Sequence, residues 1–304
     1  MKIRFLFLLS LFALAVYSCS IDGDNNQVLG ENTETPVDED GQPHPPDSEG
    51  VLETEPEAKP EIDGDTESIE DSDGNTPENN VPVTVKNDRM PTLVFNELRT
   101  EYSSPKVEFI EFLTLEPGNL EAMRLFIAGH SLSKPAYEFP PAEVEAGELI
   151  VLHLRSIEEE CVDETGEELD LSGGTEAQIN ARDFWIPGNA KLLRKTDALW
   201  ISDQDDRIID AVLLSESSGS RWSSEQVAQA AEFLSREKAW LPRSTDSDAN
   251  WIPSPADAVI TTGTTNTRTI CRDETIPPEP RAVNWYITAT SSATPGEPNN
   301  PKRY

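Results

Sequence analysis

The sequence contains little cysteine, histidine or positive charge. Among 304 residues there are 3 cysteines and 3 histidines, and 24 basic residues face 57 acidic ones, for a formal net charge of −33. A chain this acidic repels the phosphate backbone of nucleic acids, so we expect no nucleic-acid partner. Its cysteines form no Cys-x-x-Cys pair and no cysteine–histidine cluster of the kind that structural zinc sites use.

Catalytic sequence motifs are also absent. The chain has no Gly-x-Ser-x-Gly, His-Glu-x-x-His or glycine-rich phosphate-binding motif. Glu97 could pair with Glu108 or Glu111 as the acid and base of a glycosidase-like site. We favour a structural role for these carboxylates and expect the protein to have no enzymatic activity.

The N-terminus has the pattern of an export signal. Lys2 and Arg4 precede the apolar run Phe5–Val16, which a single serine interrupts. A run of this length is too short to cross a bilayer as a permanent helix but fits the apolar part of a secretory signal. A small serine stands directly before Cys19, which resembles the lipobox of bacterial lipoproteins, and the bulkier Tyr17 is similar to the looser spirochaetal lipoboxes.

This resemblance implies that residues 1–18 are a lipoprotein signal peptide and that Cys19 carries a covalent lipid, with no other cofactor expected. An ordinary signal peptide cleaved nearby is the alternative. The lipid would make the membrane the first partner of the chain. We expect the protein in the cell envelope, anchored to the outer membrane on its surface or periplasmic face.

Residues 19–89 are predicted to be a disordered acidic linker. Between Ser20 and Asp88 there are about 21 acidic residues and two lysines, with many prolines, glycines and small polar residues. Such a composition buries too little apolar surface to offset the entropy of ordering. We interpret the linker as a solvated spacer, and a ligand for cations or basic partners is the alternative.

Residues 90–300 have the rhythm of an all-β sandwich. Short apolar runs recur about every ten residues with turn signals between them. We expect strands at 92–95, 107–113, 123–128, 137–141, 149–154, 190–202, 207–214 and 258–262, and loops at 158–183 and over most of 242–280. In 107–113, Phe109 and Glu111 should share one face and Ile110 and Phe112 the other. One helix is predicted at 223–240, with Ser223 and Gln226 as a capping box.

Several of these segments resemble lamin tail domains. Leu93–Leu98 ends a strand in Asn-Glu, and Glu108–Phe112 carries an acidic-aromatic-Ile-Glu core. Ala293–Asn299 is similar to the Thr-Pro-Gly-x-Pro-Asn close of the bacterial members. The resemblance implies an immunoglobulin-like β-sandwich over 90–300, and the helix falls in an insertion around 215–284.

Two cysteines remain after the lipidated one. An exported chain with two thiols is a candidate for one disulfide, so Cys161 and Cys271 could be bonded. Two unpaired cysteines are the alternative.

Asp203, Asp205 and Asp206 place three carboxylates in one predicted hairpin turn, and oxygen ligands at that density suit Ca²⁺. The EF-hand pattern is missing, so we favour a solvated turn and expect no metal.

Tryptophans are the candidate binding residues. Aromatic side chains on loops often anchor partners, but more often they cover a small core, and we favour that interpretation. The four candidates are Trp185, Trp222, Trp240 and Trp251. We expect a non-enzymatic binding or structural module that presents the sandwich to an unknown protein or glycan. The alternatives are an accessory domain of a hydrolytic or metal-dependent enzyme system and a calcium-stabilised adhesin.

Overall fold

The computed structural model describes residues 86–244 and 251–304. The predicted signal peptide, Cys19 and all of the predicted linker before residue 86 lie outside these residues. The last linker residues contact the folded part, where Asn87 Nδ2 donates to the carbonyl oxygen of Asn119 at 2.8 Å. Among the described helices, none is long and apolar enough to cross a membrane.

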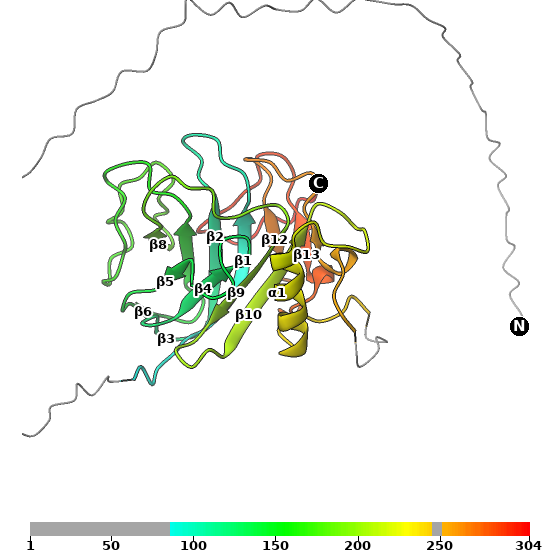
Figure 1. Ribbon diagram of the computed structural model, residues 1–304. Coiled ribbons are helices and arrows are strands. Elements are labelled where there is room, and N and C mark those ends of the chain that lie inside the picture. The colour runs from blue at the N-terminus through cyan, green and yellow to red at the C-terminus, as the bar shows by residue number, and fades with distance from the viewer. Residues whose placement is uncertain (1–85, 245–250) are drawn as a thin grey trace, which may run out of the picture. The chain divides into compact units, whose positions relative to one another are not determined.

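Two β-sheets pack face to face, and a two-stranded sheet lies beside them (Figure 1). The six-stranded sheet has the order β13 (Trp285–Ile287), β12 (Ile270–Arg272), β1 (Thr92–Arg99), β2 (Phe109–Glu116), β7 (Leu149–His153) and β8 (Arg182–Trp185). The five-stranded sheet has the order β11 (Val259–Ile260), β10 (Ile208–Ser215), β9 (Asp197–Ser202), β4 (Arg124–Ile127) and β5 (Tyr137–Glu138). The small sheet pairs β3 (Gly118–Asn119) with β6 (Glu143–Val144). The predicted all-β sandwich is confirmed.

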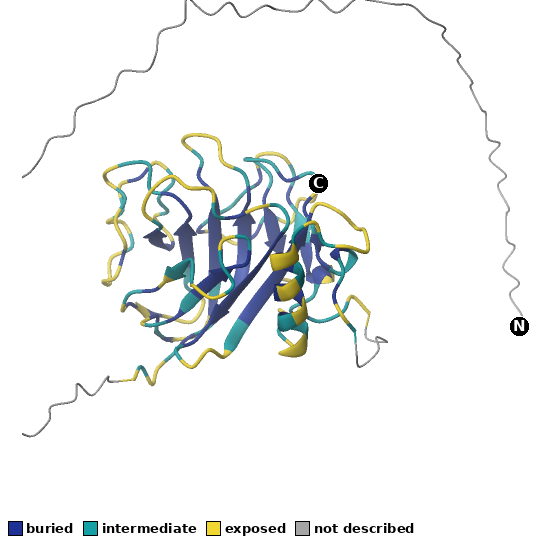
Figure 2. Ribbon diagram, viewed as in Figure 1, coloured by how far each residue is buried: buried dark blue, intermediate teal, exposed yellow. Residues whose placement is uncertain are grey.

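The main core lies between the two large sheets, whose strands are buried along most of their length (Figure 2). Alternation along β2 directs Ile110 and Phe112 into this core and Phe109 to the opposite face, as predicted. There Phe109 packs with Val151 and Ala181 in a second, smaller cluster. The six-stranded sheet is therefore covered on both faces.

The only α-helix among the described residues is α1 (Glu225–Arg236). Ser224 caps it, because its side chain accepts a hydrogen bond from the Val227 backbone N–H. The predicted cap at Ser223 is therefore wrong by one residue. The sequence could not distinguish the two, because Ser223 and Ser224 are adjacent and either side chain can cap a helix. The expected apolar stripe is confirmed, as Val227, Ala230, Ala231 and Leu234 are all buried. Two single-turn 3₁₀ helices follow, η1 (Pro255–Asp257) and η2 (Ala282–Asn284).

Short strands in predicted loops account for the main errors in the strand prediction. The loop expected at 158–183 is found except at its end, where β8 begins and pairs parallel with β7. Strand β12 was missed because its three residues carry no alternation. It is stabilised by pairing on both sides, with β1 and with β13.

The predicted disulfide is wrong. Cys271 lies buried on β12, whereas Cys161 lies half-buried in the loop before β8, and both are free thiols. Strands β12 and β8 are separated by β1, β2 and β7 in the same sheet. At about 4.8 Å per strand spacing, this separation is far beyond the reach of a disulfide.

A bulge in β1 prepares the attachment of the C-terminal segment. Phe95 pairs with Phe112 and Glu97 pairs with Glu111, so Asn96 is the extra residue in the ladder. The bulge leaves the Phe95 backbone N–H free to donate to Asp210 of β10 at 2.9 Å, which links the two sheets. It also sets the buried carboxylates of Glu97 and Glu111 side by side.

These two carboxylates hold the C-terminal segment. Glu97 accepts hydrogen bonds from the backbone N–H of Thr294, at 3.1 and 3.2 Å, and from the Thr269 hydroxyl. Glu111 accepts from the Gly296 backbone N–H at 2.6 Å. Asn299 Nδ2 then donates to the side-chain oxygen of Asn96 at 3.0 Å. The segment 294–299 is therefore bound by side chains of the β1 bulge and of β2.

The substitution Gly296→Ala should destabilise the sandwich more than Gly147→Ala. Both glycines have a positive φ, 77° and 87°, at which a Cβ costs about 1 kcal/mol. A Cβ at Gly296 would also lie 3.0 Å from the Cβ of Gln178, whereas at Gly147 it would meet nothing within 4 Å. In urea unfolding we expect losses of about 1 kcal/mol for Gly147→Ala and about 2 kcal/mol for Gly296→Ala. Equal losses would mean that the segment does not press against Gln178.

Candidate functional site

The three glutamates considered as the acid and base of a catalytic site all bind groups of the chain itself, although Glu97 and Glu111 lie side by side. Glu97 and Glu111 bind the C-terminal segment, and Glu108 forms a two-pronged ion pair with Arg155, at 2.5 and 2.7 Å. Burial raises the pKa of Glu97, and the hydrogen bond from Thr269 opposes this. Burial raises the pKa of Glu111 well above its usual range, and the charge of Glu97 adds to the effect. The carboxylate oxygens of all three glutamates accept hydrogen bonds from donors of the chain itself, which fits the structural role expected for them.

The aspartates of the calcium candidate also point to separate partners. Asp203 accepts from Arg207 Nε at 2.7 Å, and burial competes with the hydrogen bonds from Arg207, which leave the pKa of Asp203 lowered. Asp205 pairs with Lys86, and Asp206 pairs with Arg124 at 2.9 Å. Within 86–244 and 251–304, no group of three or more acidic, histidine or cysteine side chains is placed to hold a metal ion. The turn is therefore an ion-paired turn rather than a converging ligand set.

The four tryptophans proposed as binding residues belong mainly to the core. Trp240 is fully buried and donates to the carbonyl oxygen of Asp257, at 3.1 Å. Trp185 is 5% exposed and stacks on His153 with 3.8 Å between ring centroids. Trp222 and Trp251 are half-buried and pack against the main core. The core interpretation fits the burial of Trp240, whereas Trp185 also lines a cleft together with Tyr137 and Asp163.

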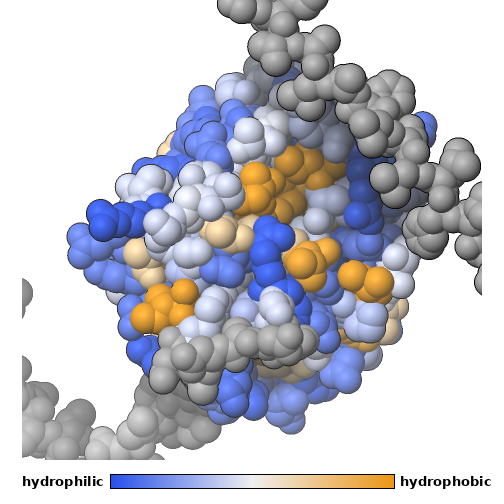
Figure 3. All heavy atoms as spheres, turned by 90° about the vertical axis from the view of Figure 1, so that its right-hand side faces the viewer, coloured by the Kyte–Doolittle hydropathy of each residue, from blue (hydrophilic) through white to orange (hydrophobic). Residues whose placement is uncertain are grey.

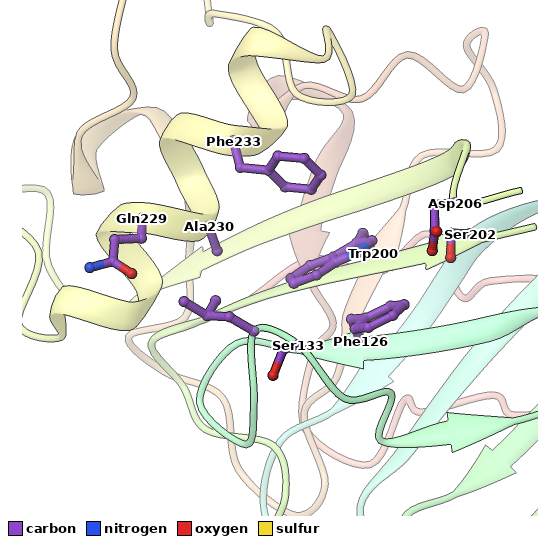
Figure 4. A pocket seen from close by; sticks show the side chains of 9 residues that line it. Phe126, Ser133, Trp200, Ser202, Asp206, Gln229, Ala230 and Phe233 are labelled. Carbon is purple, nitrogen blue, oxygen red and sulfur yellow. The ribbon is translucent and has the colours of Figure 1, made fainter.

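A different set of aromatic residues lines a cavity of about 340 Å³ between α1 and the outer face of the five-stranded sheet, which we call the α1 pocket (Figure 4). Strands β4 and β9 supply its sheet side through Phe126, Trp200 and Ser202. Helix α1 supplies Gln229, Ala230 and Phe233, and the connecting loops supply Leu132, Ser133 and Asp206. The volume lies at the lower end of the range of roughly 300–1,000 Å³ for ligand sites.

Strand pairing explains the aromatic lining. Phe126 and Trp200 are partners in the β4–β9 register, so their side chains stand next to each other on the outer face. Their rings are parallel, with centroids 4.9 Å apart, and Phe233 of α1 meets Trp200 edge to face. The sequence signal was present, because the apolar run at 123–128 has large side chains on both faces.

The loop that carries Leu132 and Ser133 is held by Asp197 of β9. Asp197 Oδ1 accepts from the backbone N–H groups of Gly129 at 2.8 Å and Ala198 at 3.0 Å. Gly129 is required for this approach, since a Cβ there would lie 2.7 Å from Asp197 Oδ2. Burial raises the pKa of Asp197 to about 6, although the hydrogen bond from Gly129 opposes the shift.

A second cleft of about 500 Å³ lies beside β11 and β13, lined in part by Ile260, Val283, Ile287 and Tyr304. Figure 3 shows that apolar side chains on that side of the molecule form patches separated by hydrophilic residues. Two arginines at this cleft are already engaged, since Arg243 donates to Ala256 and Arg303 pairs with Asp273. The α1 pocket is thus the better candidate site.

The fold and the pocket define an all-β sandwich module with a ligand-sized cavity under α1. The chain belongs to the family TP_1001_2nd, described as "protein second domain", which matches residues 91–287. It is also similar to an uncharacterized protein of Treponema pallidum (strain Nichols), 31% identical over 162 residues. That match covers 49% of this chain and 40% of the relative, so the chain spans about two fifths of the relative's length.

Deprotonation of Asp197 should lower the stability of the sandwich. Because its folded pKa of about 6 exceeds the ordinary 3.8, its folded state binds the proton more tightly than the unfolded state does. The unfolding free energy should therefore be highest below about pH 4 and fall by about 3 kcal/mol from this group as the pH rises through 6.

The measurement is urea unfolding of wild type and Asp197→Asn between pH 4 and 7. Asparagine keeps the acceptor for Gly129 but does not titrate, so the fall should be smaller in the variant. The exposed Asp170→Asn is the control and should keep the wild-type slope. A wild-type slope in Asp197→Asn would contradict the assignment.

Proposed function

We propose that the protein is a non-enzymatic binding module of the cell envelope, anchored by a lipid on Cys19, and that it contacts its partner through the α1 pocket. The observation that carries this proposal is the pocket itself, which combines an aromatic wall with a polar rim in a ligand-sized cavity. Pockets of this composition are the default binding sites of proteins.

The partners of the buried glutamates support a binding role over a catalytic one. Glu97 and Glu111 accept hydrogen bonds from the C-terminal segment, and Glu108 forms an ion pair with Arg155. None of the three lines the α1 pocket, whose one carboxylate is Asp206. That carboxylate is already paired with Arg124 at 2.9 Å.

The resemblance to lamin tail domains is part of the same proposal. Three motifs carry that resemblance, and they meet in space, because Asn96, Glu97 and Glu111 bind the segment 294–299. A shared physical contact is a reason for such motifs to occur together. It supports an immunoglobulin-like sandwich of this type, used as a scaffold that presents a surface.

The substitution Cys19→Ser should remove the lipid. In cells fed labelled palmitate, we expect the full chain to carry label and to fractionate with membranes, and the variant to lose both properties. Cys161→Ser is the control and should keep the label. Label retained on Cys19→Ser would contradict the anchor.

Blocking the pocket should abolish partner contact on intact cells. Ser133 is exposed at the pocket rim, so Ser133→Trp should fill the cavity without disturbing the core. In proximity crosslinking, we expect partners of the wild type to disappear in Ser133→Trp. The matched control is Ser103→Trp, which adds the same side chain at an exposed serine in the β1–β2 connection. Unchanged crosslinks in Ser133→Trp would remove the pocket from the function.

A further inference from the structure

One end of the α1 pocket holds a buried hydroxyl without a partner. Ser202 lines the pocket and is 2% exposed, yet its Oγ has no hydrogen-bond partner among the described residues. Buried polar atoms in folded proteins are nearly always hydrogen-bonded, so an exception at a cavity wall points to a ligand. Figure 4 places Ser202 and Asp206 together at the end of the pocket away from Gln229.

A second unpartnered donor lies next to Ser202. Arg124 of β4 is the register partner of Ser202, so the two side chains share the outer face of the sheet. Arg124 Nη2 is engaged, because it donates to the Asp203 carbonyl oxygen at 2.7 Å and pairs with Asp206 at 2.9 Å. Its Nε is buried and has no partner within the part of the chain that the structure describes.

The pocket thus has a chemically divided lining. At one end are the Ser202 hydroxyl and the carboxylate of Asp206, which together offer a donor and several acceptors. Arg124 lies next to this end but is not part of the lining. Along the rest of the cavity are the rings of Phe126, Trp200 and Phe233. A fitting ligand has an apolar face and, at one edge, hydroxyl groups that both donate and accept.

We propose that the α1 pocket binds a pyranose ring of a glycan. This inference rests on the proposed function and names its ligand. The C–H face of a pyranose packs against aromatic rings, and its hydroxyls can donate to Asp206 while accepting from the Ser202 hydroxyl.

Two other ligand classes fit less well. An apolar side chain of a protein partner would leave the buried Ser202 Oγ without a hydrogen-bond partner, whereas a ligand hydroxyl would supply one. A carboxylate ligand would meet Asp206 at the same end of the pocket, in a chain whose formal net charge is −33. A neutral polyhydroxyl ring avoids both costs.

The test uses the full chain and a panel of methyl pyranosides (glucose, galactose, mannose and N-acetylglucosamine), together with an array of glycans that contain these rings. Binding is measured by calorimetry and tryptophan fluorescence. We expect at least one pyranoside to bind and Ser202→Ala to weaken it about tenfold, as loss of one hydrogen bond predicts. The melting temperature of Ser202→Ala should not fall, because the unpartnered hydroxyl contributes nothing to folding.

The matched control is Thr114→Val. Thr114 Oγ1 is likewise buried and without a partner among the described residues, but it lies on β2 in the other sheet. Its removal should leave pyranoside binding unchanged. Equal binding by wild type and Ser202→Ala would overturn the proposal.

The proposed function and the pyranose can fail separately. If no pyranoside or glycan binds while Ser133→Trp still abolishes crosslinks on cells, the pocket is functional and the pyranose is wrong. If the crosslinked partner is a protein whose contact survives enzymatic deglycosylation, a peptide occupies the pocket and the pyranose is again wrong. Loss of the crosslinks on deglycosylation would support the proposal.

Discussion

The hydrogen bonds between two buried carboxylates and the C-terminal segment are the contact on which the rest of the structure depends. The bulge at Asn96 sets Glu97 and Glu111 side by side, where they accept the backbone N–H groups of Thr294 and Gly296. Burying these carboxylates without hydrogen-bond donors would cost folding free energy. Without the carboxylates, the backbone N–H groups of the segment would have no acceptors. Each half of the contact therefore requires the other. The same bulge frees the backbone N–H of Phe95 for the bond that links the two sheets.

The candidate site exists because α1 covers only part of the outer face of the five-stranded sheet. Helix α1 packs its apolar stripe on the side of β9 rather than on β4. Phe126 and Trp200 lie where this cover ends, with Phe233 above them (Figure 4). The loop that forms the remaining wall is held by Asp197, which accepts the backbone N–H of Gly129. A binding site at a partly covered sheet face needs no catalytic residues, which agrees with the proposed role.

Local patterns predicted the elements better than the site. Alternation identified both faces of β2, and helical spacing identified the four buried residues of α1. Spacing does not report which tryptophan borders a cavity, so Trp200, which is as buried as Trp185, was not among the candidates. The disulfide prediction failed for a similar reason, because the number of cysteines does not reveal the three strands between β12 and β8.

By itself the sequence determined the fold class, the position of the helix and the motifs around Asn96, Glu111 and Gly296, because these depend on periodicity and turn chemistry within short segments. Only the tertiary structure decided what those motifs contact and where a cavity lies. The reason is that the groups around Ser202 and Arg124 come from distant parts of the chain. Whether a polar atom has a partner depends on residues about 80 positions away along the chain, such as Asp203 beside Arg124.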